Sequence, residues 1–493
     1  MTRNKAGLRP GGRGFSFFDC MPFSSRLSAG LIVALVSLLP LGCEKKDPLA
    51  ERKFQLLVEE NGRLAQALGS RKPADVPTGS AIPGYSTAAV ATVTRANERM
   101  RKILDEHARA EALAANKVQR EAVEKQVVTI RDLDFLEPVN YQVLNRKEIK
   151  DTISAKLAEV FSVEEFKHMA DAMAAVGLIP ANYPLRQKYI DLLGEQVAAF
   201  YDQHAHKLFM YEDATLDNAQ NRVVLAHELT HALQDQHFGL KRLPLETKTN
   251  DDRAAAASAL VEGDATLVMS EFMIKNMTKQ MFKDSLMASF TQNMKQLETA
   301  PRFLREMLVF PYLRGQEFCA ALYGLGGYEA VSKAYANPPS STAQILHPQK
   351  YLANPREEPI NIEWTDVQAH GEKPICDNVV GEMGIRILLT EWVDATTGER
   401  AADGWRGDRY VYYGGDALLW KTQWANEKEA QEFFEAEQKA LEKRYHPANA
   451  KSEAGRYEAN GPRVLRLHQV APDAVVLIDA KDAEWAEALE KVH

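Results

Sequence analysis

Apolar residues recur at helical spacing through most of the chain, and strand-like patterns interrupt them in two places. Between residues 140 and 193 this spacing predicts three helical segments, broken by the sequence GLIPANYP. The stretch that follows, QVAAFYDQHAHKLFMYED (196–213), predicts a β-hairpin because apolar and aromatic residues such as Phe200 and Leu208 flank a short polar turn.

Two long helices are predicted after the hairpin. Asp217 or Asn218 can cap the first, and Gly239 provides its C-terminal stop. The second, in NDDRAAAASALVEGDATLVMSEFMIKNM (250–277), is capped by Asn250 or Asp251 and is rich in small residues. Glycine in mid-helix costs about 1 kcal/mol relative to alanine. We therefore interpret Gly263 as a point where another helix approaches closely.

The pattern changes again beyond residue 400. RYVYY and ALLWKTQW read as strands, EKEAQEFFEAEQKALEK as a helix, and PRVLRLHQV and AVVLIDA as two further strands, which together predict a ββαββ module. We expect an α+β fold that is mainly helical. Its predicted parts are a signal at 1–43, a tether rich in Pro, Gly and Ser at 44–95, a main domain at 96–400 and the module at 401–493.

The N-terminal region carries a secretion pattern. Arg26 precedes an apolar run that is shorter than the roughly 20 residues needed to span a bilayer and is typical of a signal peptide. Its end, LLPLGC, resembles a bacterial lipobox, with Pro40 where leucine is usual; this resemblance implies cleavage before Cys43 and attachment of lipid to that cysteine. An uncleaved anchor and secretion with an unmodified Cys43 are the alternatives, and Met21 is an alternative start. The predicted location is the bacterial cell envelope, lipid-anchored and facing the periplasm or the cell surface.

Charge and cysteine content narrow the function classes. The formal net charge of -8, with acidic and basic residues interspersed, leaves no basic stripe for nucleic acid. No CxxC spacing exists, so a cysteine-based zinc site is excluded. In an exported chain, Cys319 and Cys376 can form a disulfide or remain two buried thiols.

The sequence HELTHALQDQHF (227–238) places three histidines and a glutamate in the first long helix. His227 and His231 differ by about 40° around a helix, so both imidazoles project toward a single ion. Glu228 lies beside them, where a carboxylate can take a proton from zinc-bound water and pass it to a leaving amine. With 12 histidines in the chain, an HExxH pattern arises by accident in only about 2% of cases.

A catalytic zinc usually has three protein ligands, so one more is needed. His237 stands where the HExxHxxGxxH pattern places its third histidine, but Gln234 replaces the glycine that breaks the helix. On a continuous helix His237 is rotated about 80° from His227 and displaced about 15 Å, so it cannot reach the ion. Glu262, in ALVEGDAT on the small-residue helix, is the better candidate, and its neighbour Asp264 is a candidate to orient a ligating histidine.

These motifs resemble those of gluzincin zinc peptidases, in which a glutamate from a later helix completes the HExxH site. The sequence is similar to a group of predicted bacterial and archaeal peptidase-MA-like metallohydrolases, often lipoproteins, that share HELTHALQDQHF and ALVEGDAT, and the similarity extends from about residue 127 to 434. The resemblance implies a zincin-like domain with His227, His231 and Glu262 as Zn²⁺ ligands and Glu228 as the general base.

The resemblance also implies a strand edge that binds extended substrate and a donor that stabilises the oxyanion. By analogy the edge is the predicted hairpin. His347, Tyr351 and Tyr201 are the candidate donors, of which His347 is assigned as catalytic.

The leading hypothesis is therefore a membrane-tethered zinc metallopeptidase that acts on peptide or protein substrates and is held to the membrane by lipidated Cys43, with no nucleic-acid partner. Two alternatives stay open. One is a zincin-fold lipoprotein that binds or assembles partners without turnover. The other is a zinc hydrolase of a non-peptide amide, such as one in cell-wall material.

Overall fold

A computed structural model of the chain describes residues 99, 102, 105–145, 147–149, 151–152, 154–155, 161–194, 199–212, 214–276, 299–364 and 367–492. The predicted signal and tether, including Cys43, lie outside the described residues. The described part is α+β and mainly helical, as the sequence predicts. Of the helices in these ranges, none is both long enough and apolar enough to cross a membrane.

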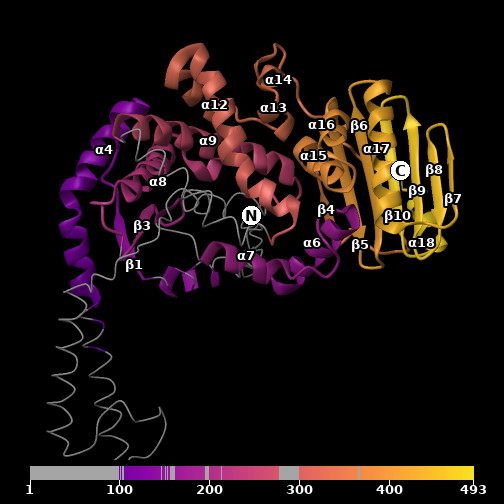
Figure 1. Cartoon of the computed structure of the whole chain (residues 1–493), viewed down its shortest axis with the longest axis horizontal. Helices are drawn as coiled ribbons and strands as arrows, with labels where there is room; N and C mark the ends of the chain where they lie inside the picture. Colours follow the sequence, from indigo (N-terminus) through magenta and orange to yellow (C-terminus); the bar gives the residue numbers. More distant parts are fainter. Residues whose placement is uncertain are drawn as a thin grey trace, which may run out of the picture.

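The helical part of the molecule precedes the C-terminal sheet in sequence and lies beside it in space (Figure 1). Its helices are α4 (Lys117–Arg131), α6 (Val163–Val176), α7 (Leu185–Gly194), α8 (Ala219–Phe238), α9 (Asp251–Asn276), α12 (Arg302–Ala336), α13 (Thr342–Leu346) and α14 (Pro348–Leu352), with a short 3-10 turn, η2, at Leu240–Arg242.

A small sheet borders these helices, with strand order β1-β3-β2. The predicted hairpin is confirmed: β2 (Ala199–Asp202) pairs antiparallel with β3 (Lys207–Tyr211). The first of the three helical segments predicted from residue 140 is wrong at its start, because β1 (Tyr141–Leu144) is a strand that pairs parallel to β3. Four residues are too few to show the alternation of apolar and polar residues that is typical of a strand. The strand forms because Leu144 packs in a small cluster with Phe209 and Tyr211.

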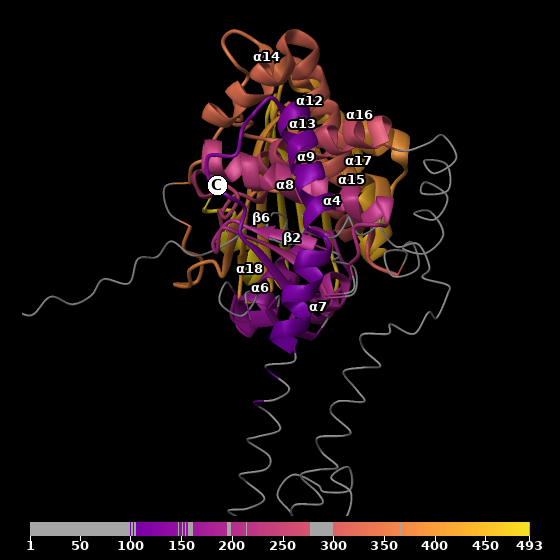
Figure 2. The ribbon, with the colours of Figure 1, turned by 90° about the vertical axis from the view of Figure 1, so that its left-hand side faces the viewer.

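Helices α8, α9 and α12 form the centre of one hydrophobic core, with α4 packed on their outer side. Figure 2 shows α4 in front of α8 and α9 from this end of the molecule. The alanine run of α9, Ala254–Ala257, is completely buried. Small side chains thus allow α9 to lie between its neighbours at close range.

The C-terminal sheet has seven strands in the order β4-β5-β6-β10-β9-β8-β7. Its strands are β4 (Cys376–Asn378), β5 (Trp405–Tyr413), β6 (Ala417–Trp424), β7 (Ala450–Glu453), β8 (Arg456–Asn460), β9 (Val464–Ala471) and β10 (Ala474–Ala480), and the accompanying helices are α15 (Gly381–Trp392), α16 (Ala395–Ala402), α17 (Glu427–Tyr445) and α18 (Ala483–Leu489). The predicted ββαββ elements are all present. The prediction missed β4, α18 and the β7–β8 hairpin, whose first strand is fully exposed and so has no apolar alternation.

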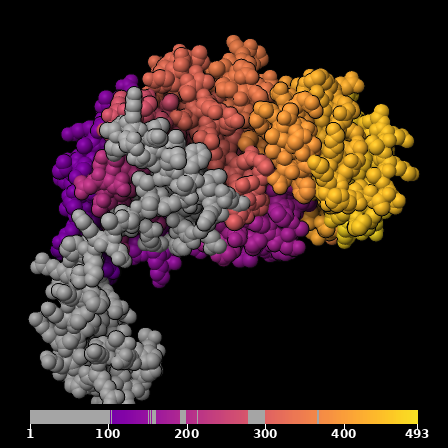
Figure 3. Space-filling model, viewed as in Figure 1, coloured from indigo at the N-terminus to yellow at the C-terminus, as the bar shows by residue number. Residues whose placement is uncertain are grey.

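Helices cover both faces of this sheet. Trp420 faces Phe433 of α17, and Leu419, its neighbour in β6, belongs to a separate cluster with Trp485 of α18. Side chains of adjacent strand residues point to opposite faces of a sheet, which explains why Trp420 and Leu419 belong to different clusters. Figure 3 shows this C-terminal unit at one end of an elongated molecule.

The hydrophobic core on the α17 face continues into the helical part, across the boundary predicted at residue 400. It includes Phe166 and Met173 of α6 together with Trp405 and Phe433. Arg444 of α17 also donates hydrogen bonds to carbonyl oxygens at the C-terminus of α6, 2.9 Å from Val176 and 2.6 Å from Ala175. The C-terminal unit is therefore packed directly on the helical part.

Candidate metal centre

Helix α8 carries the two histidines and the adjacent glutamate of the HExxH sequence. Asn218 caps its N-terminus by accepting a hydrogen bond from the Gln220 amide, and Gly239 ends it in the left-handed conformation with φ of 67°. The helix is continuous through the whole motif, as predicted. His227 and His231 therefore lie one turn apart on the same face, and both are buried.

Glu262 of α9 meets this pair and completes a triad. The His227 Nε2 atom lies 3.0 Å from His231 Nε2 and 3.2 Å from Glu262 Oε2, and His231 Nε2 lies 3.4 Å from the same oxygen. Ligand atoms about 2.0–2.2 Å from a tetrahedral zinc are separated by roughly 3.3 Å. The three predicted ligands thus have the mutual spacing of a metal site.

The donor chemistry of the triad also fits a divalent cation. Two imidazole Nε2 atoms and one carboxylate oxygen converge on one point in the buried interior. A single proton can satisfy only one of these contacts, whereas a cation at the centre satisfies all three.

A close helix crossing places Glu262. A Cβ atom added at Gly263 would lie 2.1 Å from the carbonyl carbon of Gly315 in α12, and one added at Gly315 would lie 2.1 Å from the Ala259 carbonyl oxygen. The sequence predicts close approach at Gly263, and this is confirmed. The helix that approaches this glycine is α12, whereas Glu262, the preceding residue, faces the histidine-bearing helix α8.

A buried chain of polar contacts supports His231 from behind. Its Nδ1 lies 2.8 Å from Oε1 of Gln234, and the Gln234 amide nitrogen donates to Val261 O and Asp264 Oδ2, both at 3.0 Å. Asp264 also forms an ion pair of 2.9 Å with Arg131 of α4. The prediction that Asp264 orients a ligating histidine therefore holds only indirectly, through Gln234.

Glu228 bonds to the hairpin and is close enough to His231 and Glu262 to interact with both electrostatically. Its Oε2 accepts a hydrogen bond of 2.8 Å from the Tyr201 amide of β2. Its Oε1 is buried and has no hydrogen-bond partner among the described residues. Burial raises the pKa of this carboxyl to about 8, against the opposing effect of His231. A free oxygen beside the triad is what a base acting on metal-bound water requires.

The three triad residues change one another's pKa values. Burial lowers the pKa of His227 to about 4, which keeps its imidazole neutral and able to donate a lone pair. Burial opposes charge on Glu262 too, but His231 and His227 lower its pKa to about 2. Against the effect of burial, Glu262 raises the pKa of His231 to about 9. A metal ion would therefore displace the proton of His231, since neutral histidine and ionised carboxylate are the forms that bind metal.

Tyr312 of α12 is a site residue that the sequence interpretation missed. Its ring stacks on His227, with centroids 6.0 Å apart and an angle of 23° between the planes. Burial, together with the charges of Glu262 and Glu228, raises the pKa of its hydroxyl well above the ordinary value. A neutral hydroxyl close to both carboxylates can donate a hydrogen bond at this site. The available signal was its position one helical turn before Gly315, which packs on Ala259 and Gly263.

The side chains of the other candidate residues have partners outside the triad. His347 contacts Glu382 and Asp403, and no contact to the triad is described for it. The Tyr351 hydroxyl donates to Asn337 O, and that of Tyr201 to Asp235. The geometry does not support any of the three as an oxyanion donor.

His237 is absent from the triad, as predicted. Its Nε2 lies 2.7 Å from the carbonyl oxygen of Asp134. The cysteines also lie apart from each other: Cys319 is a buried free thiol in α12, and Cys376 is a free thiol in β4. Of the two alternatives for this pair, the structure has the thiols.

Comparison with known proteins gives little about the metal centre. Residues 372–493 match a domain of unknown function (DUF8575), which covers the C-terminal unit and not the triad. No curated protein matches the chain. A crystal structure of a candidate hydrolase with a novel fold from Chloroflexus aurantiacus aligns with 15% identity and a TM-score of 0.34, covering 61% of this chain and 99% of that one.

Proposed function

We propose that the protein is a zinc-dependent metallopeptidase with a zincin-like domain, tethered to the bacterial envelope through lipidated Cys43. The observation that carries the proposal is the buried triad of His227, His231 and Glu262. The partnerless Glu228 oxygen beside it supports the same interpretation, because the reaction needs a base that faces the metal-bound water.

Zinc in this triad would lower the pKa of a bound water and polarise the scissile carbonyl. The protein's own groups do the rest. Glu228 takes the proton at its free oxygen and returns it to the leaving amine, while the Tyr201 amide holds the other oxygen in place. Tyr312 donates its hydroxyl hydrogen to the charge that develops on the substrate oxygen.

The hairpin supports recognition of extended peptide. β2 is one of the two edge strands of the small sheet in the described part of the chain, and its Tyr201 amide donates directly to the base. A peptide that pairs with this edge would place a scissile bond beside Glu228. Because Glu228 occupies the Tyr201 amide, we expect substrate to pair with the outward-facing backbone two residues away, at Ala199, since Phe200 and Asp202 pair with β3.

Cleavage of an unfolded protein such as casein by the zinc-loaded chain tests the proposal. Glu228→Gln should abolish cleavage, because the amide cannot accept the proton. It should retain zinc, because residue 228 is not one of the ligands. Glu317→Gln, an exposed residue of α12, is the matched control and should cleave normally. Cleavage that persists in Glu228→Gln would remove this residue as the base.

The same assay separates the alternatives. Hydrolysis of cell-wall fragments but not of peptides would indicate a non-peptide amide hydrolase. Zinc binding without hydrolysis of either substrate would indicate a binding or assembly protein. Cys43→Ser tests the tether separately, since it should release the protein from the membrane fraction.

A further inference from the structure

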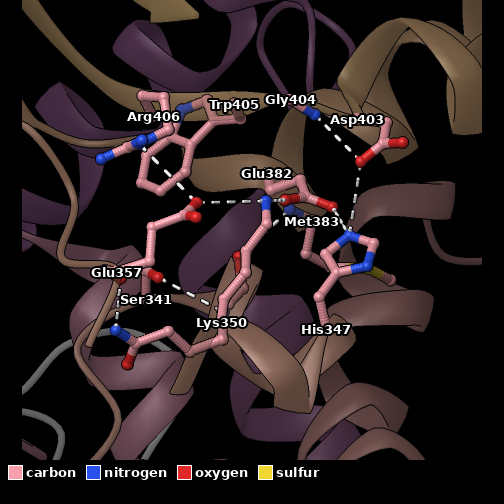
Figure 4. A network of polar contacts seen from close by, with 12 residues as sticks. Ser341, His347, Lys350, Glu357, Glu382, Met383, Asp403, Gly404, Trp405 and Arg406 are labelled. Atoms are coloured by element: carbon pink, nitrogen blue, oxygen red, sulfur yellow. Dashed lines mark hydrogen bonds and ion pairs between the residues drawn. The ribbon is translucent and has the colours of Figure 1, made fainter. Parts of the chain in front are cut away.

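A second group of side chains of the types that ligate metals lies where the α13–α14 segment meets α15 and α16 (Figure 4). His347 Nε2 is 2.5 Å from Glu382 Oε1 and 3.8 Å from Asp403 Oδ1. All three ligand atoms lie within 4.8 Å of one another. None of these residues belongs to the centre described above.

Three separate elements supply the group. His347 is the residue between α13 and α14, Glu382 lies in the first turn of α15, and Asp403 follows α16. Glu382 is buried, with 3% of its surface exposed, whereas the Asp403 side chain is 63% exposed. The group therefore has one fixed interior carboxylate and one side open to water, which could complete the coordination of an ion.

A simple ion pair leaves part of this geometry unexplained. The His347 Nε2 atom can donate one hydrogen, which the near oxygen of Glu382 accepts. Asp403 Oδ1 is oriented toward the same nitrogen by a hydrogen bond of 2.9 Å from the Gly404 amide, yet at 3.8 Å it is too far to share that hydrogen. A cation between the three atoms would contact all of them. To reach the roughly 3.3 Å expected around tetrahedral zinc, Glu382 Oε1 would move away from Nε2, from 2.5 Å, and exposed Asp403 Oδ1 would approach it, from 3.8 Å.

The surrounding charges leave room for a divalent ion. Lys350 Nζ lies 3.4 Å from the other oxygen of Glu382, so it neutralises one carboxylate without occupying the face toward His347. Glu357 lies 3.9 Å from Lys350 and 3.7 Å from Arg406, so these further charges balance each other. With neutral histidine, the cluster keeps the negative charge of Asp403, which a divalent cation would compensate.

We propose that His347, Glu382 and Asp403 form a second, structural site for a divalent transition-metal ion, with Zn²⁺ as the best match to one imidazole and two carboxylates. The ion joins the α13–α14 segment to α15 and α16. The same segment holds α9, since the Thr342 amide donates to Asp252 Oδ1 at 3.1 Å. The site thereby fixes the start of the helix that carries Glu262, and it does not depend on the proposed peptidase activity.

Calorimetric titration of the metal-stripped full chain with Zn²⁺ tests this site. We expect two binding events in the native sequence. Asp403→Asn should weaken one of them by more than the roughly 10- to 100-fold that loss of an outer-shell partner costs. His231→Ala should remove the binding event of the triad and leave that of the His347 group, which distinguishes the two sites.

His468→Ala is the matched control, because His468 pairs with Glu458 at 3.1 Å and is not in a three-residue metal group of the described chain. It should retain both events. Asp403 is exposed, so its substitution should leave the fold intact, and circular dichroism checks this. A single event in the native chain, or two unchanged events in both Asp403→Asn and His347→Ala, would overturn the proposal.

Discussion

Gln234 Oε1 lies 2.8 Å from His231 Nδ1, and this contact determines which nitrogen of the histidine is free. The Gln234 amide nitrogen faces two acceptors, Val261 O and Asp264 Oδ2, so its oxygen must face the ring. His231 Nδ1 then carries a hydrogen, which leaves Nε2, the nitrogen that faces His227 and Glu262, as the one that would bind a metal ion. The residue that excludes His237 by keeping the helix continuous also prepares His231 to bind metal.

Gln234→Ala should therefore weaken zinc binding by about 10- to 100-fold, because the His231 ring loses its orienting partner. Competition with a chromogenic chelator measures the affinity. Gln236→Ala provides the control, since its side chain bonds the exposed backbone of residues 136 and 137 instead. Equal affinities for the two variants would show that the Gln234 contact does not orient the ligand.

Gly315→Ala should destabilise the protein and reduce its zinc content. The added methyl group would meet the Ala259 carbonyl oxygen at 2.1 Å and force α9 and α12 apart. We expect a loss of about 1–3 kcal/mol in the free energy of unfolding, measured by urea denaturation. Gly324→Ala in the same helix has nothing within 4 Å and should be neutral or stabilising. A normal zinc content in Gly315→Ala would mean that the crossing does not position Glu262.

Tyr312→Phe should lower kcat by about 10²- to 10³-fold with little change in zinc content, because only the donated hydrogen bond is lost. Tyr323→Phe, on an exposed part of α12, is the control and should retain full activity. Peptide-cleavage kinetics give the comparison. A kcat near that of the native protein in Tyr312→Phe would remove the hydroxyl from the mechanism.

Titration of Glu437 should lower the free energy of unfolding as the pH rises. Glu437 is completely buried in α17, and burial raises its pKa from 4.5 to about 8, because Arg444 at 4.0 Å compensates only in part. Between these values the folded chain binds the proton more tightly than the unfolded chain, so the free energy of unfolding decreases from about pH 4.5 to pH 8 and then levels off.

Glu437→Gln should remove this contribution, and urea midpoints at pH 5 and pH 9 measure it. Glu435→Gln, on the exposed side of the same helix, should behave like the native chain. If Glu437→Gln and the native chain show the same dependence on pH, the carboxyl does not titrate as described.

The parts of the site predictable from sequence were those that a single helix encodes. The spacing of His227 and His231 and the stop at Gly239 are local, and the structure has them as predicted. The cap is Asn218, one of the two residues that the sequence offered. Glu262 could be selected because an acid in an apolar run needs a buried partner. Tyr312 contacts His227, and Arg131 contacts Asp264, only because different helices cross at these points. A pattern within one helix cannot predict such contacts.

The same distinction applies to the fold. The apolar strands β9 and β10 could be predicted, but the exposed β7 and the four-residue β1 could not. The role of His347 was inferred from its segment alone. Its actual neighbours, Glu382 and Asp403, come from residues 35 and 56 positions later, so only the tertiary structure brings them together.

Zinc analysis of the full chain tests the central claim most directly, with Glu262→Gln and His237→Ala measured in parallel. We predict that Glu262→Gln loses one zinc ion relative to the native chain and that His237→Ala loses none. Loss of zinc from His237→Ala with full retention in Glu262→Gln would contradict the assignment of the triad.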